Sequence, residues 1–273
     1  MPESKLPISV PKNRYQALLE RIFFARHKKG TKEIVFDRDE LVLAAKALDI
    51  VLPKNLGDVI YSVRYRTPMP APIVATQSAG FEWIIEGLGP ARYAFRLAKL
   101  SRIVPNLSLV TIKVPDSTPE IISAYALSDE QALLAIVRYN RLIDIFLGIA
   151  SYSLQSHLRT SVKGIGQIEI DEVYVGLDRS GRQFVVPVQA KGGNDKIGAV
   201  QTKQDIACCK AKFPELICRA ISAQFVEKDL IALFELTDEG SSIRIVDEAH
   251  YRLVPAREIS PGDLNSYRER KSS

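Results

Sequence analysis

The amino-acid sequence predicts a mixed α/β (α+β) fold in two domains, which cover residues 1–104 and 105–273. The chain of 273 residues is long enough for two domains, and its 46% hydrophobic and 25% charged residues are typical of an ordinary globular protein. Apolar residues at helical spacing dominate the front half, and β-rich runs bounded by turn residues close that half and recur in the rear half. This mixture of segments predicts both helices and sheets in each domain.

The front domain is predicted to contain short helices followed by a β-hairpin. The expected elements are helices at 13–27 and 39–50, a helical segment at 52–66, a strand at 33–36 and a β-rich run at 81–98. Asp37 and Glu40 stand at capping-box spacing before the second helix, and Gly87, Gly89 and Pro90 form the turn of the β-rich run. Two short helices followed by strands predict a winged helix-turn-helix domain, and a simple helical hairpin is the alternative.

The charge of the chain is unevenly distributed. Residues 1–104 hold 17 Lys and Arg against 10 Asp and Glu, whereas residues 105–273 hold 20 and 22, so the net charges are +7 and −2. We expect the front part to bind a polyanion and the rear part to hold a cation, although uneven scatter of surface charge is the alternative. Side chains suited to base edges and phosphates are Lys54, Asn55, Asp58, Ser62 and Arg64, and those suited to backbone phosphates are Arg66, Arg92, Arg96 and Arg102.

The rear domain is predicted to alternate between helices and strands. The expected elements are a strand at 108–115, a short helix opening at Ser117, one long helix at 129–148, a helix at 196–213 and strands at 218–226, 230–237 and 243–255. Ser128 and Gln131 stand at capping-box spacing, Gly148 ends the long helix, and Asp195 caps the later one. Segment 152–160 is compatible with helix or loop, and residues 261–273 are expected to form a frayed polar tail.

A β-hairpin is predicted in the middle of the rear domain. Two β-rich runs, 167–177 and 183–191, flank Asp178-Arg179-Ser180-Gly181, whose residue types favour a tight turn. The first run carries three acidic residues, and the second ends in Gln189-Ala190-Lys191. Pairing around this turn sets Asp171 opposite Gln189, whereas a bulge would bring Glu172 there instead. The acidic residues concerned are Glu169, Asp171 and Glu172.

Carboxylates, an amide oxygen and a lysine at one point of a sheet suit metal-assisted hydrolysis of a phosphodiester. Mg²⁺ prefers oxygen ligands, so Asp171 is expected to bind it together with the side-chain oxygen of Gln189 and the carbonyl of Ala190. Lys191 would position the attacking water and stabilise charge on the phosphate. Glu172 or Glu169 would compensate for the neutral Gln189. The alternative is an edge hairpin with a solvated acidic face, in which Lys191 is a surface charge.

The hairpin resembles the catalytic motif of the PD-(D/E)xK nuclease superfamily, and most of the chain is similar to its type II restriction-endonuclease-like members. The match is Asp171 on one strand, then Gln189-x-Lys191 on the next, followed by a helix with Gln201 and Gln204, one of which could touch DNA or a metal-bound water. The commonest form of the motif has Glu where this chain has Gln189.

The resemblance implies an αβββαβ core preceded by the winged-helix-like domain. It also implies Mg²⁺-dependent, sequence-specific hydrolysis of double-stranded DNA by a homodimeric endodeoxyribonuclease, with a companion DNA methyltransferase acting on the same site. Two alternatives stay open. One is a catalytically weak or inactive DNA-binding or regulatory protein on a nuclease scaffold, and the other is a structure-specific repair nuclease.

Several other functions are disfavoured by the sequence. The three cysteines and three histidines lack zinc-site spacing, so we expect reduced, buried thiols at Cys208, Cys209 and Cys218. The glycines after Lys191 lack the spacing of a phosphate-binding loop. No apolar run suggests a signal peptide or a membrane span, which favours the cytoplasm. His157 is interpreted as structural, whereas Arg159 and Lys163 are candidate phosphate contacts.

Overall fold

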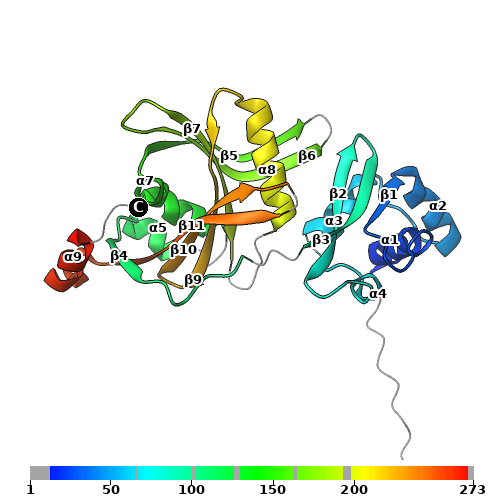
Figure 1. Ribbon diagram of the computed structural model, residues 1–273, viewed down its shortest axis with the longest axis horizontal. Helices are drawn as coiled ribbons and strands as arrows, with labels where there is room; N and C mark the ends of the chain where they lie inside the picture. Colours follow the sequence, from blue (N-terminus) through cyan, green and yellow to red (C-terminus); the bar gives the residue numbers. More distant parts are fainter. Residues whose placement is uncertain are drawn as a thin grey trace, which may run out of the picture. The chain divides into compact units, whose positions relative to one another are not determined.

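The computed structural model describes residues 13–65, 67–99, 103–125, 130–162, 165–192, 198–240 and 242–269. The chain divides into two compact units, one made of residues 1–100 with 163–166, the other of residues 101–162 with 167–273. Both mix helices with sheets, and the larger unit contains a curled mixed sheet (Figure 1). Within the described ranges, every helix is too short or too polar to cross a membrane.

The first unit contains helices and a three-stranded antiparallel sheet. Its elements are α1 (Arg14–Phe24), β1 (Glu33–Asp37), α2 (Asp39–Leu48), α3 (Gly57–Tyr65), α4 (Ala71–Val74), β2 (Phe81–Gly89) and β3 (Arg92–Lys99). The strand order is β1-β3-β2. Phe23 of α1 and Phe36 of β1 both contact the ring of Phe95 on β3, with centroids 5.2 and 5.1 Å apart. These fully buried rings join α1 to the sheet. The predicted helices and strands of this part of the chain occur in the expected order, with the short helix α4 in addition.

The second unit is built on one mixed sheet. Its helices are α5 (Glu120–Tyr125), α6 (Glu130–Tyr139), α7 (Leu142–Leu147), α8 (Ala199–Lys212), the short 3-10 helix η1 (Ala256–Glu258) and α9 (Pro261–Arg268). Its strands are β4 (Thr111–Pro115), β5 (Ala150–Val162), β6 (Gly166–Leu177), β7 (Gln183–Lys191), β8 (Ile217–Cys218), β9 (Ala220–Glu227), β10 (Leu230–Asp238) and β11 (Ile243–Val254). The order is β4-β11-β10-β9-β7-β6-β5, with β8 paired to β7. Strands β7 and β9 run parallel, as do β11 and β4.

Alternating residues of the strands divide the core into two layers. Val188 of β7 and Leu233 of β10 belong to the cluster that includes Leu133 of α6. Phe234, the neighbour of Leu233, belongs instead to the cluster that includes Ile206 of α8. Because successive side chains of a strand point to opposite faces, α6 covers one face of the sheet and α8 covers the other. The side chain of Gln189, next to Val188, therefore lies on the α8 face.

The predicted long helix at 129–148 is two helices, α6 and α7. Arg141 between them has a left-handed backbone with φ of 50°. Buried Asn140 accepts a hydrogen bond from the backbone N–H of Ser117 at 2.7 Å and donates to Thr118 Oγ1 at 2.8 Å. These contacts with a segment about twenty residues upstream hold the end of α6. Helical periodicity alone therefore overestimated the length of the helix, although Gly148 does end α7, with φ of 65°.

The ambiguous segment 152–160 is a strand. It lies within β5, which pairs with β6 at the edge of the sheet. Most of its side chains are exposed on both faces, so the sequence shows no clean alternation between apolar and polar residues. The strand is held by its pairing with β6 rather than by local preference, which explains why local reasoning left it undecided.

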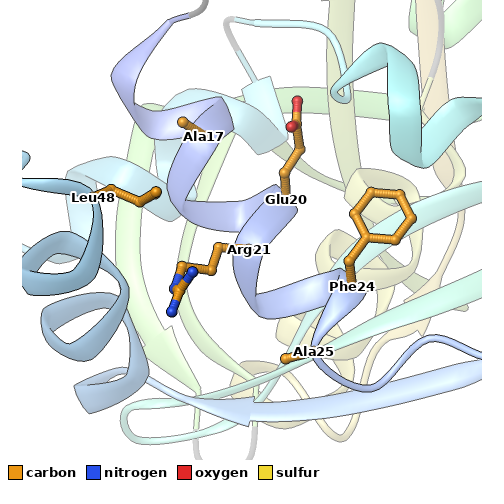
Figure 2. Close-up of a pocket in the computed structure, with 6 residues that line it drawn as sticks. All are labelled: Ala17, Glu20, Arg21, Phe24, Ala25 and Leu48. Carbon is orange, nitrogen blue, oxygen red and sulfur yellow. The ribbon is translucent and has the colours of Figure 1, made fainter.

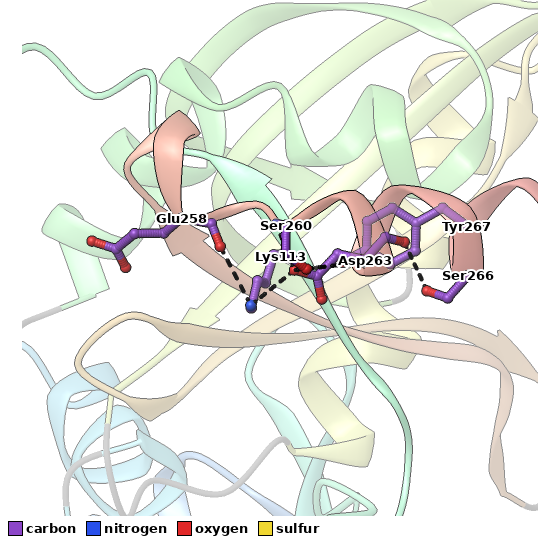
Figure 3. Close-up of polar contacts among 6 residues, drawn as sticks. All are labelled: Lys113, Glu258, Ser260, Asp263, Ser266 and Tyr267. Atoms are coloured by element: carbon purple, nitrogen blue, oxygen red, sulfur yellow. Dashed lines mark hydrogen bonds and ion pairs between the residues drawn. The ribbon is translucent and has the colours of Figure 1, made fainter.

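The C-terminal segment, predicted to be frayed, contains helix α9. Ser260 and Asp263 form a reciprocal capping box, and Pro261 occupies the first turn. Lys113 of β4 fixes this helix: its Nζ lies 3.0 Å from Asp263 Oδ2, and its backbone N–H donates to the Tyr267 hydroxyl at 3.0 Å (Figure 3). Hydrogen bonds from Ser260 and the ammonium of Lys113 lower the pKa of Asp263 to about 2. The anchoring lysine is distant in sequence, so the prediction missed it.

Candidate functional site

The predicted hairpin is confirmed. Strands β6 and β7 pair antiparallel from Glu172 opposite Val188 to Leu177 opposite Gln183. The connecting turn is closed by Asp178, whose Oδ1 accepts from the backbone N–H groups of Ser180 at 2.8 Å and Arg182 at 3.0 Å. The turn residues thus set the register that the sequence indicated.

Asp171 lies at the open end of this hairpin, beside the Gln189-Ala190-Lys191 segment. Its Oδ2 accepts a hydrogen bond from the backbone N–H of Ala190 at 3.0 Å. The N–H of Ala190, rather than its carbonyl, is thus the group in contact with the carboxylate. Burial raises the pKa of Asp171, whereas the Ala190 hydrogen bond, the ammonium of Lys191 and the nearby His157 oppose that rise. Asp171, Gln189 and Lys191 are brought together on the α8 face.

Gln189 is buried against a carboxylate that the sequence reasoning missed. Its side-chain amide donates a hydrogen bond to Oδ2 of Asp205 on α8, and the two side chains are 3% and 2% exposed. Burial raises the pKa of Asp205 well above its usual range; Gln189 opposes this shift and the charge of Asp171 adds to it. A signal was available, because Asp205 occupies the same helical stripe as buried Thr202, Ile206 and Cys209.

Lys191 is held by a second residue that was missed. Its Nζ lies 3.2 Å from Glu130 Oε1, at the start of α6. Glu130 is 61 positions away in the chain, and an acidic residue in the first turn of a helix is ordinarily interpreted as complementing the helix dipole. The ion pair brings Glu130 to the edge of the site that contains Asp171 and Lys191.

Glu172 does not join this group. It pairs with Val188, so its side chain lies on the α6 face, opposite to that of Asp171. There it is 0% exposed and accepts hydrogen bonds from Arg138 Nε at 2.9 Å and from the Ser153 hydroxyl. Its charge is thus matched within the α6 layer. The hairpin has no bulge over its paired residues that would turn Glu172 toward Gln189.

The residues present fit a hard divalent cation. Within the described ranges, Gln189 Oε1 and Asp205 Oδ1 are buried without a hydrogen-bond partner, and Asp171 adds a partly buried carboxylate. Orphaned oxygens beside a carboxylate are the donor type that Mg²⁺ takes, with water and substrate phosphate completing its coordination. The same described residues contain no cluster of three or more His, Cys, Asp or Glu side chains suited to a metal ion. Binding of a cation here would therefore depend on the amide oxygen of Gln189 together with the carboxylates of Asp171 and Asp205.

In the first unit, two of the predicted DNA-contacting residues bind each other. Asn55 precedes α3 and accepts from the Gly57 N–H at 3.0 Å, while its amide donates to Asp58 Oδ1 at 2.9 Å. Lys54 also precedes the helix, and Ser62 lies within it. Asn55 is therefore a cap of α3.

The remaining predicted contacts fall into three groups. On β3, Arg96 pairs with Glu33 at 2.6 Å and Glu86 at 3.3 Å, while Arg92 is exposed. On α8, Gln201 is partly buried and Gln204 is buried. The side chain of Arg64, and all of Arg66 and Arg102, lie outside the described residues, as do Ser128, Lys163 and Asp195.

A hollow in the first unit lies over α1 and is distinct from the hairpin. Figure 2 shows it bordered by Leu48 of α2, with Glu20, Arg21 and Phe24 of α1 around it. One carboxylate and one guanidinium among apolar groups do not form a metal or nucleophile site.

The chain matches no family model, no curated protein and no solved structure in the three comparisons made. Any functional assignment therefore rests on the residues of the hairpin and their geometry.

Proposed function

We propose that the protein is a Mg²⁺-dependent endonuclease that hydrolyses phosphodiester bonds of double-stranded DNA at specific sequences, acting as a homodimer. The observation that carries this proposal is the hydrogen bond from the Ala190 N–H to Asp171, which holds that carboxylate beside the Gln189-Ala190-Lys191 segment at the open end of the hairpin. A carboxylate, an amide oxygen and an ammonium in this arrangement serve both cation binding and charge stabilisation at a phosphate.

The order of elements supports the resemblance to the PD-(D/E)xK superfamily. Helices α6 and α7 are followed by β5, β6 and β7, then by α8, and then by the two-residue β8 and by β9, both of which pair parallel with β7. This sequence of elements is compatible with the αβββαβ core that the resemblance implies. In the first unit, α2 and α3 are followed by the β2–β3 hairpin, which is compatible with a winged helix-turn-helix domain.

The proposed reaction assigns a role to each side chain of the site. Hydrolysis joins a water oxygen to phosphorus, breaks the bond to one sugar oxygen and moves a proton from that water to the leaving oxygen. Lys191, held by Glu130, orients the water and stabilises negative charge on the phosphate. Asp171, Gln189 and the Ala190 carbonyl would hold Mg²⁺, which supplies Lewis-acid stabilisation and a more acidic water. Asp205 fixes the orientation of the Gln189 amide.

The test is digestion of a long mixed-sequence DNA by the purified protein in Mg²⁺ or in EDTA. Lys191→Ala is the inactive variant, and Lys228→Ala, which removes an exposed lysine after β9, is the matched control. We expect discrete fragments with Mg²⁺ from the parent and the control, and none with EDTA or from Lys191→Ala.

Other results would identify the alternatives. A smear that requires Mg²⁺ and Lys191 would indicate a nonspecific or repair nuclease, because the same site would act without sequence choice. A gel shift without cutting, equal in the parent and in Lys191→Ala, would overturn the enzymatic proposal and leave a DNA-binding protein whose neutral Gln189 replaced a catalytic acid.

A further inference from the structure

The edge strand β5 carries an unusual histidine beside the candidate site. His157 has φ of 49°, in the left-handed region, although it lies within a strand. Non-glycine residues rarely adopt this conformation, and it persists where surrounding contacts determine it. A left-handed residue in a strand turns its side chain away from the regular alternation. The imidazole of His157 is 49% exposed, so solvent-accessible ligands can reach it.

One carboxylate faces both His157 and Arg159. Oε1 of Glu169 on β6 lies 3.0 Å from Arg159 Nη2 and 3.8 Å from His157 Nδ1. An imidazole that faces a carboxylate through Nδ1 turns its Nε2 away from that carboxylate. The guanidinium of Arg159 is 68% exposed, so much of its surface is open to solvent. Glu169 therefore faces a guanidinium and an imidazole at the surface.

These side chains lie next to the proposed catalytic residues. Glu169 and Asp171 are two apart on β6 and share a face of the sheet. His157 and Lys191 both act to lower the pKa of Asp171, so both lie close to its carboxylate. Glu172 and Arg138 lie on the opposite face and are paired with each other. The charged groups near His157 thus include Arg159 on its own strand and Glu169 and Asp171 on the paired strand β6.

We infer that His157 and Arg159, oriented by Glu169, bind a phosphate of the DNA backbone beside the scissile bond. The inference rests on the proposed function, because a nucleic-acid substrate supplies the phosphate. Strand β5 suits this role, since most of its side chains are exposed. A guanidinium and an imidazole are donors matched to phosphate oxygens, and contacts of this kind position a duplex without reading its sequence. Glu169 is then a positioning residue rather than a metal ligand.

The test measures DNA binding in EDTA, where no cleavage is needed. The probe is a fluorescent duplex of mixed sequence, titrated at several KCl concentrations with the full-length protein. The variants are Arg159→Gln and His157→Asn; asparagine tolerates the left-handed backbone, so it removes the imidazole with little strain. Arg182→Gln, in the β6–β7 turn, removes an exposed arginine elsewhere and is the control. Circular dichroism establishes that each variant is folded.

We expect Arg159→Gln to weaken binding about fivefold and to lower the slope of log affinity against log salt by about 0.9, the effect of one lost phosphate contact. His157→Asn should weaken binding by a smaller factor, and Arg182→Gln should change neither quantity. In Mg²⁺, both site variants should raise KM for DNA more than they lower kcat.

Two results would overturn the inference. One is unchanged affinity and salt slope in both folded variants, even if cleavage fell, because these residues would then act only through Glu169 and Asp171. The other is absence of DNA binding by the parent protein. If the parent bound DNA but did not cut it, a loss of affinity in the variants would still support the phosphate site, and only the proposed nuclease activity would fail.

Discussion

Asp171 and Glu172 are adjacent carboxylates on one strand, and their surroundings differ completely. Glu172 is fully buried on the α6 face, where Arg138 and Ser153 bind it. Asp171 lies on the α8 face, partly exposed, with a backbone N–H as its direct contact and Lys191 nearby. Because the side-chain period of a strand is two, neighbours in sequence are separated by the whole sheet. Glu172 therefore stabilises the fold, whereas the carboxylate of Asp171 stays partly exposed to solvent.

The largest expected effect is the loss of activity on removing the Asp171 charge. If the protein is the proposed nuclease, Asp171→Asn should lower the rate of DNA cleavage by about 10³-fold, because the carboxylate proposed to anchor the cation is lost. Its fold should be retained, since burial already disfavours that charge. Glu172→Gln should instead lower the free energy of unfolding by about 1–3 kcal/mol and leave the cleavage rate of the folded protein within a few-fold. Equal loss of cleavage by both variants, measured where both are folded, would remove the distinction.

The stabilising role of Glu172 can be tested by removing its partner, Arg138. Arg138→Ala leaves the carboxylate of Glu172 buried without its cation, so we expect a destabilisation of about 3 kcal/mol. This value is at the low end of the cost of breaking a buried ion pair, because the guanidinium of Arg138 is 43% exposed. Arg244→Ala, which breaks an exposed pair with Glu239, should cost under about 1 kcal/mol. Urea denaturation of both variants measures the difference, and similar costs would mean that Glu172 is solvated when unpaired.

The hairpin could be predicted from the sequence because its determinants are local. Asp178 and Gly181 specify the turn, the β-rich runs specify the strands, and the register around that turn brings Asp171 to the segment that contains Gln189. The winged-helix and nuclease-core assignments remain proposals, although the order of elements is compatible with them.

The missed residues are held by contacts between segments distant in the chain. Glu130 reaches Lys191 across 61 positions, and Asp205 reaches Gln189 only once α8 lies on the sheet. His157 was interpreted as structural because no carboxylate is near it in sequence, yet Glu169 faces it from the paired strand. Such partners follow from strand order and helix placement, which local patterns do not determine.

Asp205 is a third carboxylate, buried against the side-chain amide of Gln189. Its pKa is raised on folding, so its protonated form stabilises the fold below about pH 4, and this contribution is lost as the pH rises toward the folded pKa. Over that window the parent should lose up to about 1.4 kcal/mol of unfolding free energy per pH unit relative to Asp205→Asn. Denaturation of both proteins at pH 4, 5, 6 and 7 measures this slope. If the difference in unfolding free energy between the two proteins did not change with pH, folding would leave the pKa of Asp205 unshifted.

The smallest expected effect concerns two arginines of β3, one paired with carboxylates and one exposed. Arg96 is neutralised by Glu33 and Glu86, whereas no carboxylate pairs with Arg92 in the described part of the chain. If the first unit binds DNA, Arg92→Gln should lower the salt slope of binding by about 0.9, because an open guanidinium displaces a counterion. Arg96→Gln should lower it less, since its charge is already matched. Titration of a mixed-sequence duplex in EDTA measures the salt slope of each variant. A larger decrease for Arg96→Gln would mean that DNA displaces the carboxylate partners of Arg96.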